Sequence, residues 1–200
     1  MEISAVQVKE LRTKTGAGIM DCKEALAATE GNVAEAADYL RTKGMLKAAK
    51  KAERKTGEGI VASYVHAGSK LAVLVEILCE TDFVARTDEF QAFAKDIAMH
   101  IAAANPRVVS REDLPADILD KEREILRAEA IESGKPEKIV AKIVDGRIDK
   151  FYSEACLLEQ PFVKDSDITV EDLVKQTIGK LGENMRIGRF ARLKLGEEPR

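Results

Sequence analysis

The sequence predicts an α+β fold, in which a small helical domain precedes a helical core that holds one small three-stranded antiparallel sheet. Aromatic residues make up only 4% of the 200 residues and Trp is absent, so aliphatic side chains must build the core, which favours helices. Apolar residues recur at helical spacing near the N-terminus and again after Phe83. Between these regions, two runs rich in β-branched residues flank a short glycine loop, a pattern typical of a β-hairpin.

The helical domain spans residues 1–44, where the pattern predicts three short helices. Ser4 is placed to cap the first helix, and Gly16 lies where that helix breaks. Asn32 is placed to cap the third helix, and Gly44 is expected to end it. A three-helix unit of this size has a marginal core of its own.

Residues 45–56 are predicted to form a basic helical linker. Only Glu53 opposes the basic side chains of this segment, which are Lys47, Lys50, Lys51, Arg54 and Lys55. Two interpretations stay open, a solvated linker face and a surface that contacts RNA.

The core domain spans residues 57–200. Residues 60–66 and 71–79 predict the β-hairpin, and the second run is nearly all apolar, which predicts a strand buried on both faces. Residues 185–195 predict the third strand.

Four further helices are predicted in the core domain. The first carries one apolar face, made of Phe90, Phe93, Ala94, Ile97, Ile101 and Ala102, and ends before Asn105. The second opens near Asp113 or Pro115, and Pro136 begins the third, a position that favours proline. Thr169 is placed to cap the last helix.

The residues that usually carry chemistry are sparse and scattered. Neither His66 nor His100 has a Cys, His or carboxylate at a familiar metal spacing, and no nucleophile signature occurs. Residues 68–70 lack the preceding half of a P-loop, so the sequence predicts no nucleotide bound by this chain. We therefore expect a binding protein with no catalytic residue, no metal site and no cofactor.

The three cysteines, Cys22, Cys79 and Cys156, are far apart and odd in number. This pattern argues against a disulfide framework or a zinc site and favours buried free thiols. No apolar run approaches the ~18–20 residues that span a bilayer, and the N-terminus does not resemble a secretory signal. The net charge of -3 gives no whole-chain sign of nucleic-acid binding. We expect a cytoplasmic protein without a stable nucleic-acid or membrane partner.

The segment from Thr81 to Arg86 is unusual because it lies where the second strand turns into a helix. Asp82 would lie near the helix N-terminus, where a carboxylate is favoured. Phe83 would ordinarily be a core residue. The alternative is an exposed aromatic side chain beside an acid on a rigid turn.

Two long segments, residues 11–26 (LRTKTGAGIMDCKEAL) and residues 81–86 (TDFVAR), resemble the signature motifs of the elongation factor Ts family. Shorter stretches are similar to that family as well: residues 97–103, Ser133-Gly134-Lys135-Pro136, Gly146-Arg147 and residues 160–163. The resemblance runs nearly from end to end.

The resemblance implies that residues 1–44 form a ubiquitin-associated-like three-helix bundle, which docks on a helix of the GTPase domain of elongation factor Tu. The positions that match the family's contact residues are Lys9, Arg12, Ile19 and Met20. Methionine is common in the family where this chain has Ile19, so the apolar contact is kept and some adaptability is lost.

The resemblance also implies a nucleotide-exchange factor that binds elongation factor Tu with GDP, displaces magnesium and promotes GDP release. Thr81, Asp82, Phe83 and Val84 match the intruding segment, and His100 matches a supporting residue. The alternative for His100 is a hydrogen-bonded histidine on a half-buried helix. No bond is made or broken, so the family function is not enzymatic.

Longer members of the family carry a duplicated half-core and a protruding coiled coil, and neither is expected in 200 residues. The resemblance implies that short members pair two chains, so we expect a homodimer that forms a two-to-two complex with the GTPase. A monomer whose own helices cover the sheet is the alternative.

Three other functions stay open at this point. A protein that binds RNA or the ribosome would use the basic linker with Arg186, Arg189, Arg192 and Lys194, and its affinity would depend steeply on salt. A small hydrolase would need His100 and no protein partner. Binding of ubiquitin-like partners by the N-terminal bundle rests on fold analogy alone.

Overall fold

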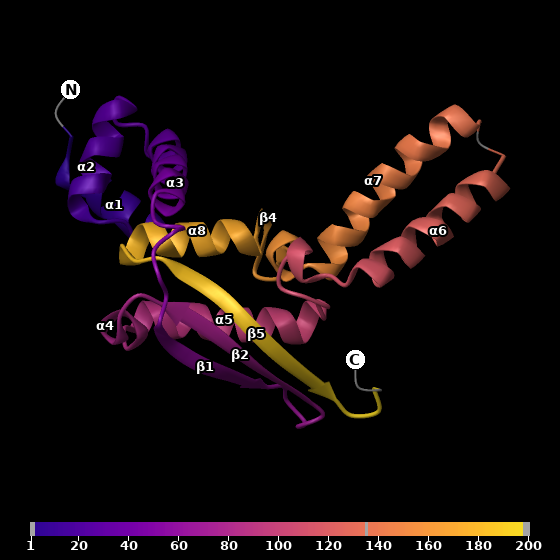
Figure 1. The fold of residues 1–200 in the computed structure, drawn as a ribbon. Helices are drawn as coiled ribbons and strands as arrows, with labels where there is room; N and C mark the ends of the chain where they lie inside the picture. Colours follow the sequence, from indigo (N-terminus) through magenta and orange to yellow (C-terminus); the bar gives the residue numbers. More distant parts are fainter. Residues whose placement is uncertain (1–2, 135, 198–200) are drawn as a thin grey trace. The chain divides into compact units, whose positions relative to one another are not determined.

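The computed structural model describes residues 3–134 and 136–197 (Figure 1). Its α-helices are α1 (Ala5–Thr15), α2 (Ile19–Ala28), α3 (Val33–Ala49), α4 (Asp82–Ala85), α5 (Asp88–Ala104), α6 (Ala116–Glu132), α7 (Glu137–Ala155) and α8 (Val170–Leu181). Its strands are β1 (Glu58–Val65), β2 (Leu71–Cys79), β3 (Pro161–Phe162), β4 (Asp165–Thr169) and β5 (Met185–Lys194). Two 3-10 turns, η1 (Arg111–Asp113) and η2 (Leu157–Glu159), complete the order. Lys135 of the Ser133–Pro136 stretch lies outside the described residues.

The chain divides into two compact units. The first holds Met1–Val61, Glu76–Ala94 and Asp172–Arg186, and the second holds Ala62–Val75, Lys95–Glu171 and Ile187–Arg200. The mixture of helices with a small sheet confirms the predicted α+β class.

The helix caps of the N-terminal region form as their sequences predict. Ser4 Oγ accepts from the Gln7 backbone N–H at 3.2 Å, while Gln7 Oε1 accepts from the Ser4 N–H at 3.0 Å. This reciprocal pair is a capping box at the start of α1. Gly16 ends α1 in the left-handed region, with φ of 66°, and Asn32 Oδ1 accepts from two N–H groups at the start of α3.

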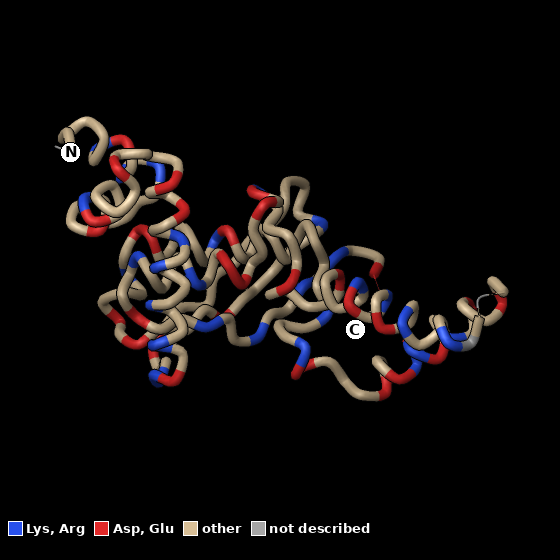
Figure 2. Tube along the Cα trace, turned by 90° about the horizontal axis from the view of Figure 1, so that it is seen from above, with Lys and Arg blue, Asp and Glu red and all other residues tan. Residues whose placement is uncertain are grey.

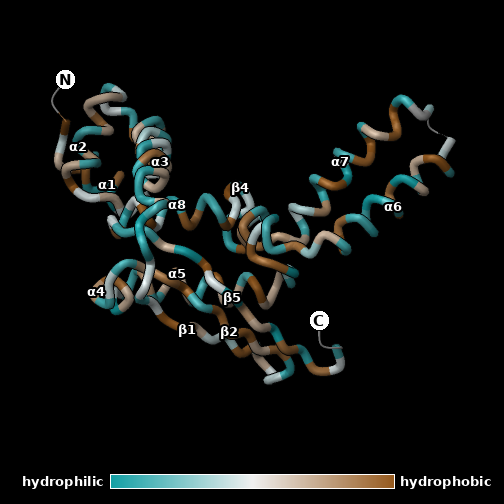
Figure 3. Tube along the Cα trace, in the orientation of Figure 1, coloured by the Kyte–Doolittle hydropathy of each residue, from teal (hydrophilic) through white to brown (hydrophobic). Residues whose placement is uncertain are grey.

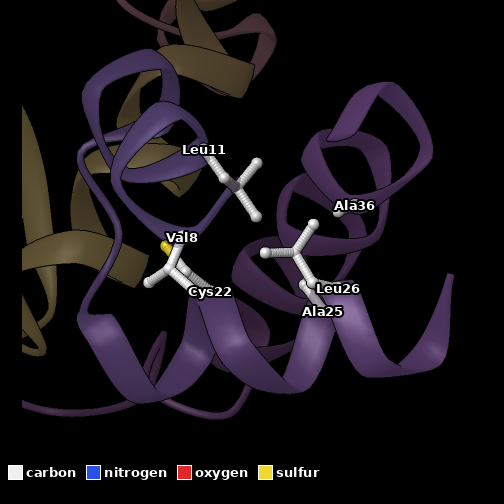
Figure 4. Close-up of a cluster of buried hydrophobic side chains, with 6 residues drawn as sticks. All are labelled: Val8, Leu11, Cys22, Ala25, Leu26 and Ala36. Atoms are coloured by element: carbon white, nitrogen blue, oxygen red, sulfur yellow. The ribbon is translucent and has the colours of Figure 1, made fainter. Parts of the chain in front are cut away.

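Helices α1 to α3 share one small apolar cluster (Figure 4). It consists of Val8, Leu11, Cys22, Ala25, Leu26 and Ala36. Cys22, Ala25 and Leu26 are the buried residues of α2. The likeness of this unit to a ubiquitin-associated domain stays a prediction.

The prediction that Gly44 ends the third helix is wrong, since α3 continues through it to Ala49. Gly44 instead lies where α8 approaches. A Cβ placed at Gly179 would lie only 3.0 Å from the Gly44 Cα, whereas a Cβ at Gly44 would meet nothing within 4 Å. Part of the segment predicted as a linker is thus the last turn of α3, and Lys47 from that turn bonds to Asp21 of α2 at 3.1 Å.

Strands β1, β2 and β5 form the three-stranded sheet with β2 in the centre. The His66 N–H donates to the Leu71 carbonyl at 2.9 Å across the β1–β2 turn. The Leu195 N–H donates to the Lys70 carbonyl at 2.8 Å, which pairs the end of β5 with the start of β2. Both neighbours of β2 are therefore antiparallel to it, as predicted.

The prediction that the second strand is buried on both faces is wrong. Its buried residues alternate with more exposed ones, and Leu74 is 53% exposed. An all-apolar run hides this alternation, because its outward residues are as apolar as its inward ones.

Helix α5 keeps the predicted apolar face, and its six predicted residues are all buried. The helix ends at Ala104, before Asn105, which takes a positive φ of 51°. In the second unit, Arg192 of β5 donates to the Ala102 carbonyl of α5 at 3.4 Å.

Helices α6 and α7 lie side by side as an antiparallel pair (Figure 1), so the chain contains a helix pair although no coiled coil was expected in it. Leu126 and Ala130 of α6 and Val140 of α7 are buried, and apolar residues alternate with polar ones along α7 (Figure 3). Arg147 binds Glu129 across the pair at 2.7 Å.

A second sheet was not predicted from the sequence. Strands β3 and β4 pair in antiparallel register, with Pro161 opposite Thr169 and Phe162 opposite Asp165. Strand β3 has only two residues, too few to show a periodicity.

Candidate partner-binding site

The short helix α4 presents an aromatic side chain to solvent. Phe83 is 88% exposed, so the core interpretation of this residue is wrong and the exposed one is confirmed. Asp82 opens the helix, where its charge is favoured, and it forms an ion pair with Arg86 one turn later. Val84 is half-buried.

Hydrogen bonds hold the backbone of this turn. Thr81 caps α4, with its Oγ1 accepting from the Val84 N–H at 3.4 Å. At the other end, Thr87 Oγ1 donates to the Val84 carbonyl at 2.8 Å and Gln91 Nε2 donates to the Ala85 carbonyl at 2.7 Å. The backbone that carries the exposed phenyl ring is therefore held by hydrogen bonds at both ends of α4.

Thr81 has a further partner that the sequence did not indicate. The Glu183 carboxylate accepts from the Thr81 N–H at 3.0 Å and from its hydroxyl at 2.6 Å. The two residues lie 102 positions apart, so no local pattern could have found this pair.

The four residues expected to contact a partner through the N-terminal region are all exposed. Lys9 and Arg12 lie on α1, one turn apart, and Ile19 and Met20 open α2. Met20 is 76% exposed and Ile19 is 49% exposed, because the core of the bundle takes later residues of α2. This bundle therefore exposes two apolar side chains and two basic side chains that a partner could contact.

His100 is fully buried on α5, and both of its ring nitrogens are bound. Nε2 lies 2.9 Å from Gln160 Oε1, and Nδ1 accepts from the Val163 N–H at 3.2 Å. Because Nδ1 is an acceptor, the ring is neutral with its proton on Nε2. Burial lowers the pKa of His100, and the hydrogen bond to Gln160 opposes this in part.

The hydrogen-bond partners of His100 are the two residues that flank β3, Gln160 and Val163, and none of residues 81–84. The structure therefore gives the hydrogen-bonded histidine that the sequence left as an alternative. A supporting role of His100 in partner binding stays a prediction.

The described residues hold no group of three or more His, Cys, Asp or Glu side chains that could bind a metal ion. Cys22, Cys79 and Cys156 are buried free thiols, as predicted. Burial raises the pKa of each thiol, to about 11 for Cys156, so thiolate chemistry is disfavoured. Within the same residues, no helix has the length and apolarity needed to cross a membrane.

The basic segment predicted as a linker, residues 45–56, is partly occupied by protein contacts. Lys47 binds Asp21, Lys51 donates to the Gly182 carbonyl, and Arg54 pairs with Glu80. Acidic and basic residues are also interspersed along the traced chain (Figure 2). These contacts leave less free positive charge than the sequence implied, which weakens the RNA-binding interpretation.

Comparison with known proteins gives one consistent result. Residues 7–197 match the family model described as elongation factor TS. The chain is 60% identical over 197 residues to elongation factor Ts of Geobacter sulfurreducens, covering 98% of this chain and 91% of that protein. It is 57% identical over 195 residues to elongation factor Ts of Desulfosudis oleivorans, covering 98% of both chains. This chain therefore belongs to the elongation factor Ts family of translation elongation factors.

Proposed function

We propose that this protein is a nucleotide-exchange factor that binds elongation factor Tu with GDP and accelerates GDP release. The observation that carries the proposal is Phe83, a large aromatic side chain that is 88% exposed on a hydrogen-bonded turn in a chain of this family. Exposed aromatic residues on rigid supports are typical binding anchors. Because the proposed partner works in translation, we place this protein in the cytoplasm.

In the proposed mechanism, Asp82 and Phe83 enter the partner beside its nucleotide site, with Thr81 and Val84 as the flanking support. Magnesium in a GTPase needs near-ideal octahedral geometry and bridges phosphate oxygens to the protein. A small displacement of its ligands weakens both the metal and the nucleotide. The phosphates of the nucleotide are bound by backbone N–H groups of the GTPase. Rotating one of these peptides would turn its carbonyl oxygen, in place of its N–H, toward the phosphate.

The N-terminal surface supplies binding rather than displacement. Ile19 and Met20 offer the apolar contact, while Lys9 and Arg12 offer charge. We propose that these four residues hold the GTPase domain of the partner while the α4 turn acts on its nucleotide site. Their loss should weaken binding and leave the rate of GDP release at saturation unchanged.

Exchange then follows from linkage. If this protein weakens GDP binding by some factor, GDP weakens the binding of this protein by the same factor. Each tenfold corresponds to about 1.4 kcal/mol. This chain makes and breaks no bond, so its role is that of a binding protein that stabilises the empty GTPase until GTP enters.

His100 has a supporting role in this proposal. Its two hydrogen bonds tie α5 to Gln160 and Val163, and α5 follows the α4 turn in the chain with only Arg86 and Thr87 between them. We propose that this tie limits the movement of α5.

We also propose that two copies of the chain associate through the outer face of the three-stranded sheet and bind two GTPase molecules. Three apolar side chains on this face, Val65, Leu74 and Leu193, are each more than half exposed. Such a face is a candidate interface between copies.

The proposal is tested by loading elongation factor Tu with a fluorescent GDP analogue and following its release by stopped flow. The intact chain should accelerate release. Phe83→Ala should lower the release rate about tenfold or more, because truncating a central aromatic anchor costs about 2 kcal/mol or more. Ile131→Ala removes another exposed apolar side chain, from α6, and serves as the matched control. Met20→Ala should raise the concentration for half-maximal effect and keep the maximal rate.

An unchanged release rate with the intact chain would overturn the proposed function. Titration of RNA binding against salt would then test the alternative. Acceleration that Phe83→Ala leaves intact would retain the function and reject the proposed role of the aromatic residue.

A further inference from the structure

Every polar atom of Thr81 has a partner. Its N–H and its hydroxyl donate to the two oxygens of Glu183, at 3.0 Å and 2.6 Å. Its carbonyl accepts from the Ala85 N–H and from Cys79 Sγ, both at 3.2 Å, and its Oγ1 accepts from the Val84 N–H. Among the hydrogen bonds of the described residues, only those to Glu183 reach Thr81 from outside residues 79–85.

Glu183 is itself fixed by its neighbours. Gly182, with φ of 79°, makes the turn between α8 and β5. On the other side, the Asn184 N–H donates to Glu80, while Asn184 Nδ2 donates to the carbonyls of Ala52 and Arg54 at 3.2 Å and 2.8 Å. The two strand ends therefore hold each other, because residue 80 binds residue 184 and residue 81 binds residue 183.

A carboxylate that accepts two hydrogen bonds from one residue fixes that residue in orientation as well as in place. The fixed residue here is the N-cap of the helix that carries Phe83. The exposed ring makes few contacts of its own, so the direction in which it projects depends on this support.

We propose that Glu183 is a positioning residue, which holds the Thr81 cap so that Phe83 reaches a partner in one orientation. The inference rests on the proposed function, in which Phe83 is the group that acts. Glu183 would affect the rate through Phe83 and would not touch the nucleotide site.

The first test uses the full-length free protein. The exchange rate of the Thr81 amide hydrogen, measured by NMR, reports on the Glu183 bond without any partner. Glu183→Ala should speed this exchange about tenfold or more, the size that the loss of a charge-assisted hydrogen bond corresponds to. Glu183→Gln should restore most of the protection, because its oxygen can accept from the N–H and its amide can donate to the hydroxyl. Glu132→Ala, an exposed residue of α6, is the control.

The second test uses the stopped-flow assay. Glu183→Ala should lower the maximal rate of GDP release about tenfold and leave the half-saturating concentration within about twofold, because the N-terminal contacts remain. Glu183→Gln should recover most of the rate. In the Phe83→Ala background, adding Glu183→Ala should change the rate by less than about twofold, since both changes remove the same interaction.

Three results would overturn the inference. If the double variant lost release rate by the product of the two single-variant factors, Glu183 would act independently of Phe83. A raised half-saturating concentration with an unchanged maximal rate would show a general loss of binding. If the intact chain fails to accelerate release at all, the proposed function falls and takes this inference with it, whereas in the first two cases the proposed function stands.

Discussion

At the scale of single residues, His100 combines full burial with two satisfied ring nitrogens. The pKa of His100 is lowered from its usual value of 6.5 because burial penalises the charged ring. The unfolded chain therefore binds this proton at a higher pH than the folded chain does. The stabilisation by the neutral ring is fully present above about pH 6.5 and is lost as the pH falls toward the lowered pKa.

We predict that the free energy of unfolding decreases between pH 6.5 and pH 5.5 by up to about 1 kcal/mol through His100 alone. Most carboxylates stay ionised in this window, and the pKa of Asp21 is further lowered by its hydrogen bond to Lys47. Urea unfolding at several pH values measures the slope.

The variant His100→Gln should lose this part of the slope, although it will be less stable at pH 7.5 by about 1–3 kcal/mol. Equal slopes in the parent and in His100→Gln would contradict the prediction.

The residues of the site differ in how far the sequence could predict them. Thr81, Asp82 and Phe83 stand out locally, since an acid and an aromatic follow a strand end. The exposure of Phe83 depends on what surrounds it, and no spacing rule determines that. Glu183 and Gln160 were missed because they meet their partners only after the chain returns from more than fifty residues away.

At the scale of elements, the crossing of α3 and α8 depends on the absence of a side chain at Gly179, which approaches Gly44 of α3. Gly44 lies inside α3, where glycine costs about 1 kcal/mol relative to alanine, and yet the helix continues through it. The close approach of Gly179 accounts for the helix contact at this point, since a Cβ at Gly179 would lie 3.0 Å from the Gly44 Cα.

We predict opposite effects of alanine at the two glycines. Gly179→Ala should destabilise the protein by about 1–3 kcal/mol, less the gain in helix propensity, because the added methyl meets backbone that must move. Gly44→Ala should stabilise it by about 0.5–1 kcal/mol, because its methyl would point into open space. Chemical denaturation of both variants measures the difference. If Gly179→Ala left the free energy of unfolding unchanged or raised it, the crossing would not depend on the contact at Gly179.

The elements also differ in how far the sequence could predict them. Caps at Ser4 and Asn32 are local chemistry and were predicted correctly. Gly44 was wrongly interpreted as a helix end, because glycine at a helix terminus and glycine at a helix crossing look the same in one sequence. The β3–β4 ladder is held by tertiary pairing of very short strands and leaves no periodic signal.

At the scale of the whole molecule, the sheet exposes a large apolar side chain from each of its three strands. Val65, Leu74 and Leu193 come from three different strands and are 60%, 53% and 74% exposed. Since β2 lies between β1 and β5, Leu74 is central among the three strands. Burying such a face against a second copy would remove apolar surface from water.

We predict that Leu74→Glu dissociates the proposed dimer, because it would leave an unpaired carboxylate in the centre of the interface. Sedimentation velocity across a range of micromolar concentrations should show the parent as a dimer and this variant as a monomer with an unchanged circular dichroism spectrum. Ile131→Glu places the same charge on an exposed apolar site of α6 and should leave the dimer intact.

The stoichiometry with elongation factor Tu extends this prediction. The parent should form a complex of two chains with two GTPase molecules, and Leu74→Glu should form a one-to-one complex. Because Phe83 lies on α4 and not on the sheet, the one-to-one complex should still accelerate GDP release. A parent chain that sediments as a monomer at all concentrations would reject the dimer without affecting the exchange function. A Leu74→Glu chain that folds but no longer promotes release would show instead that exchange requires both copies.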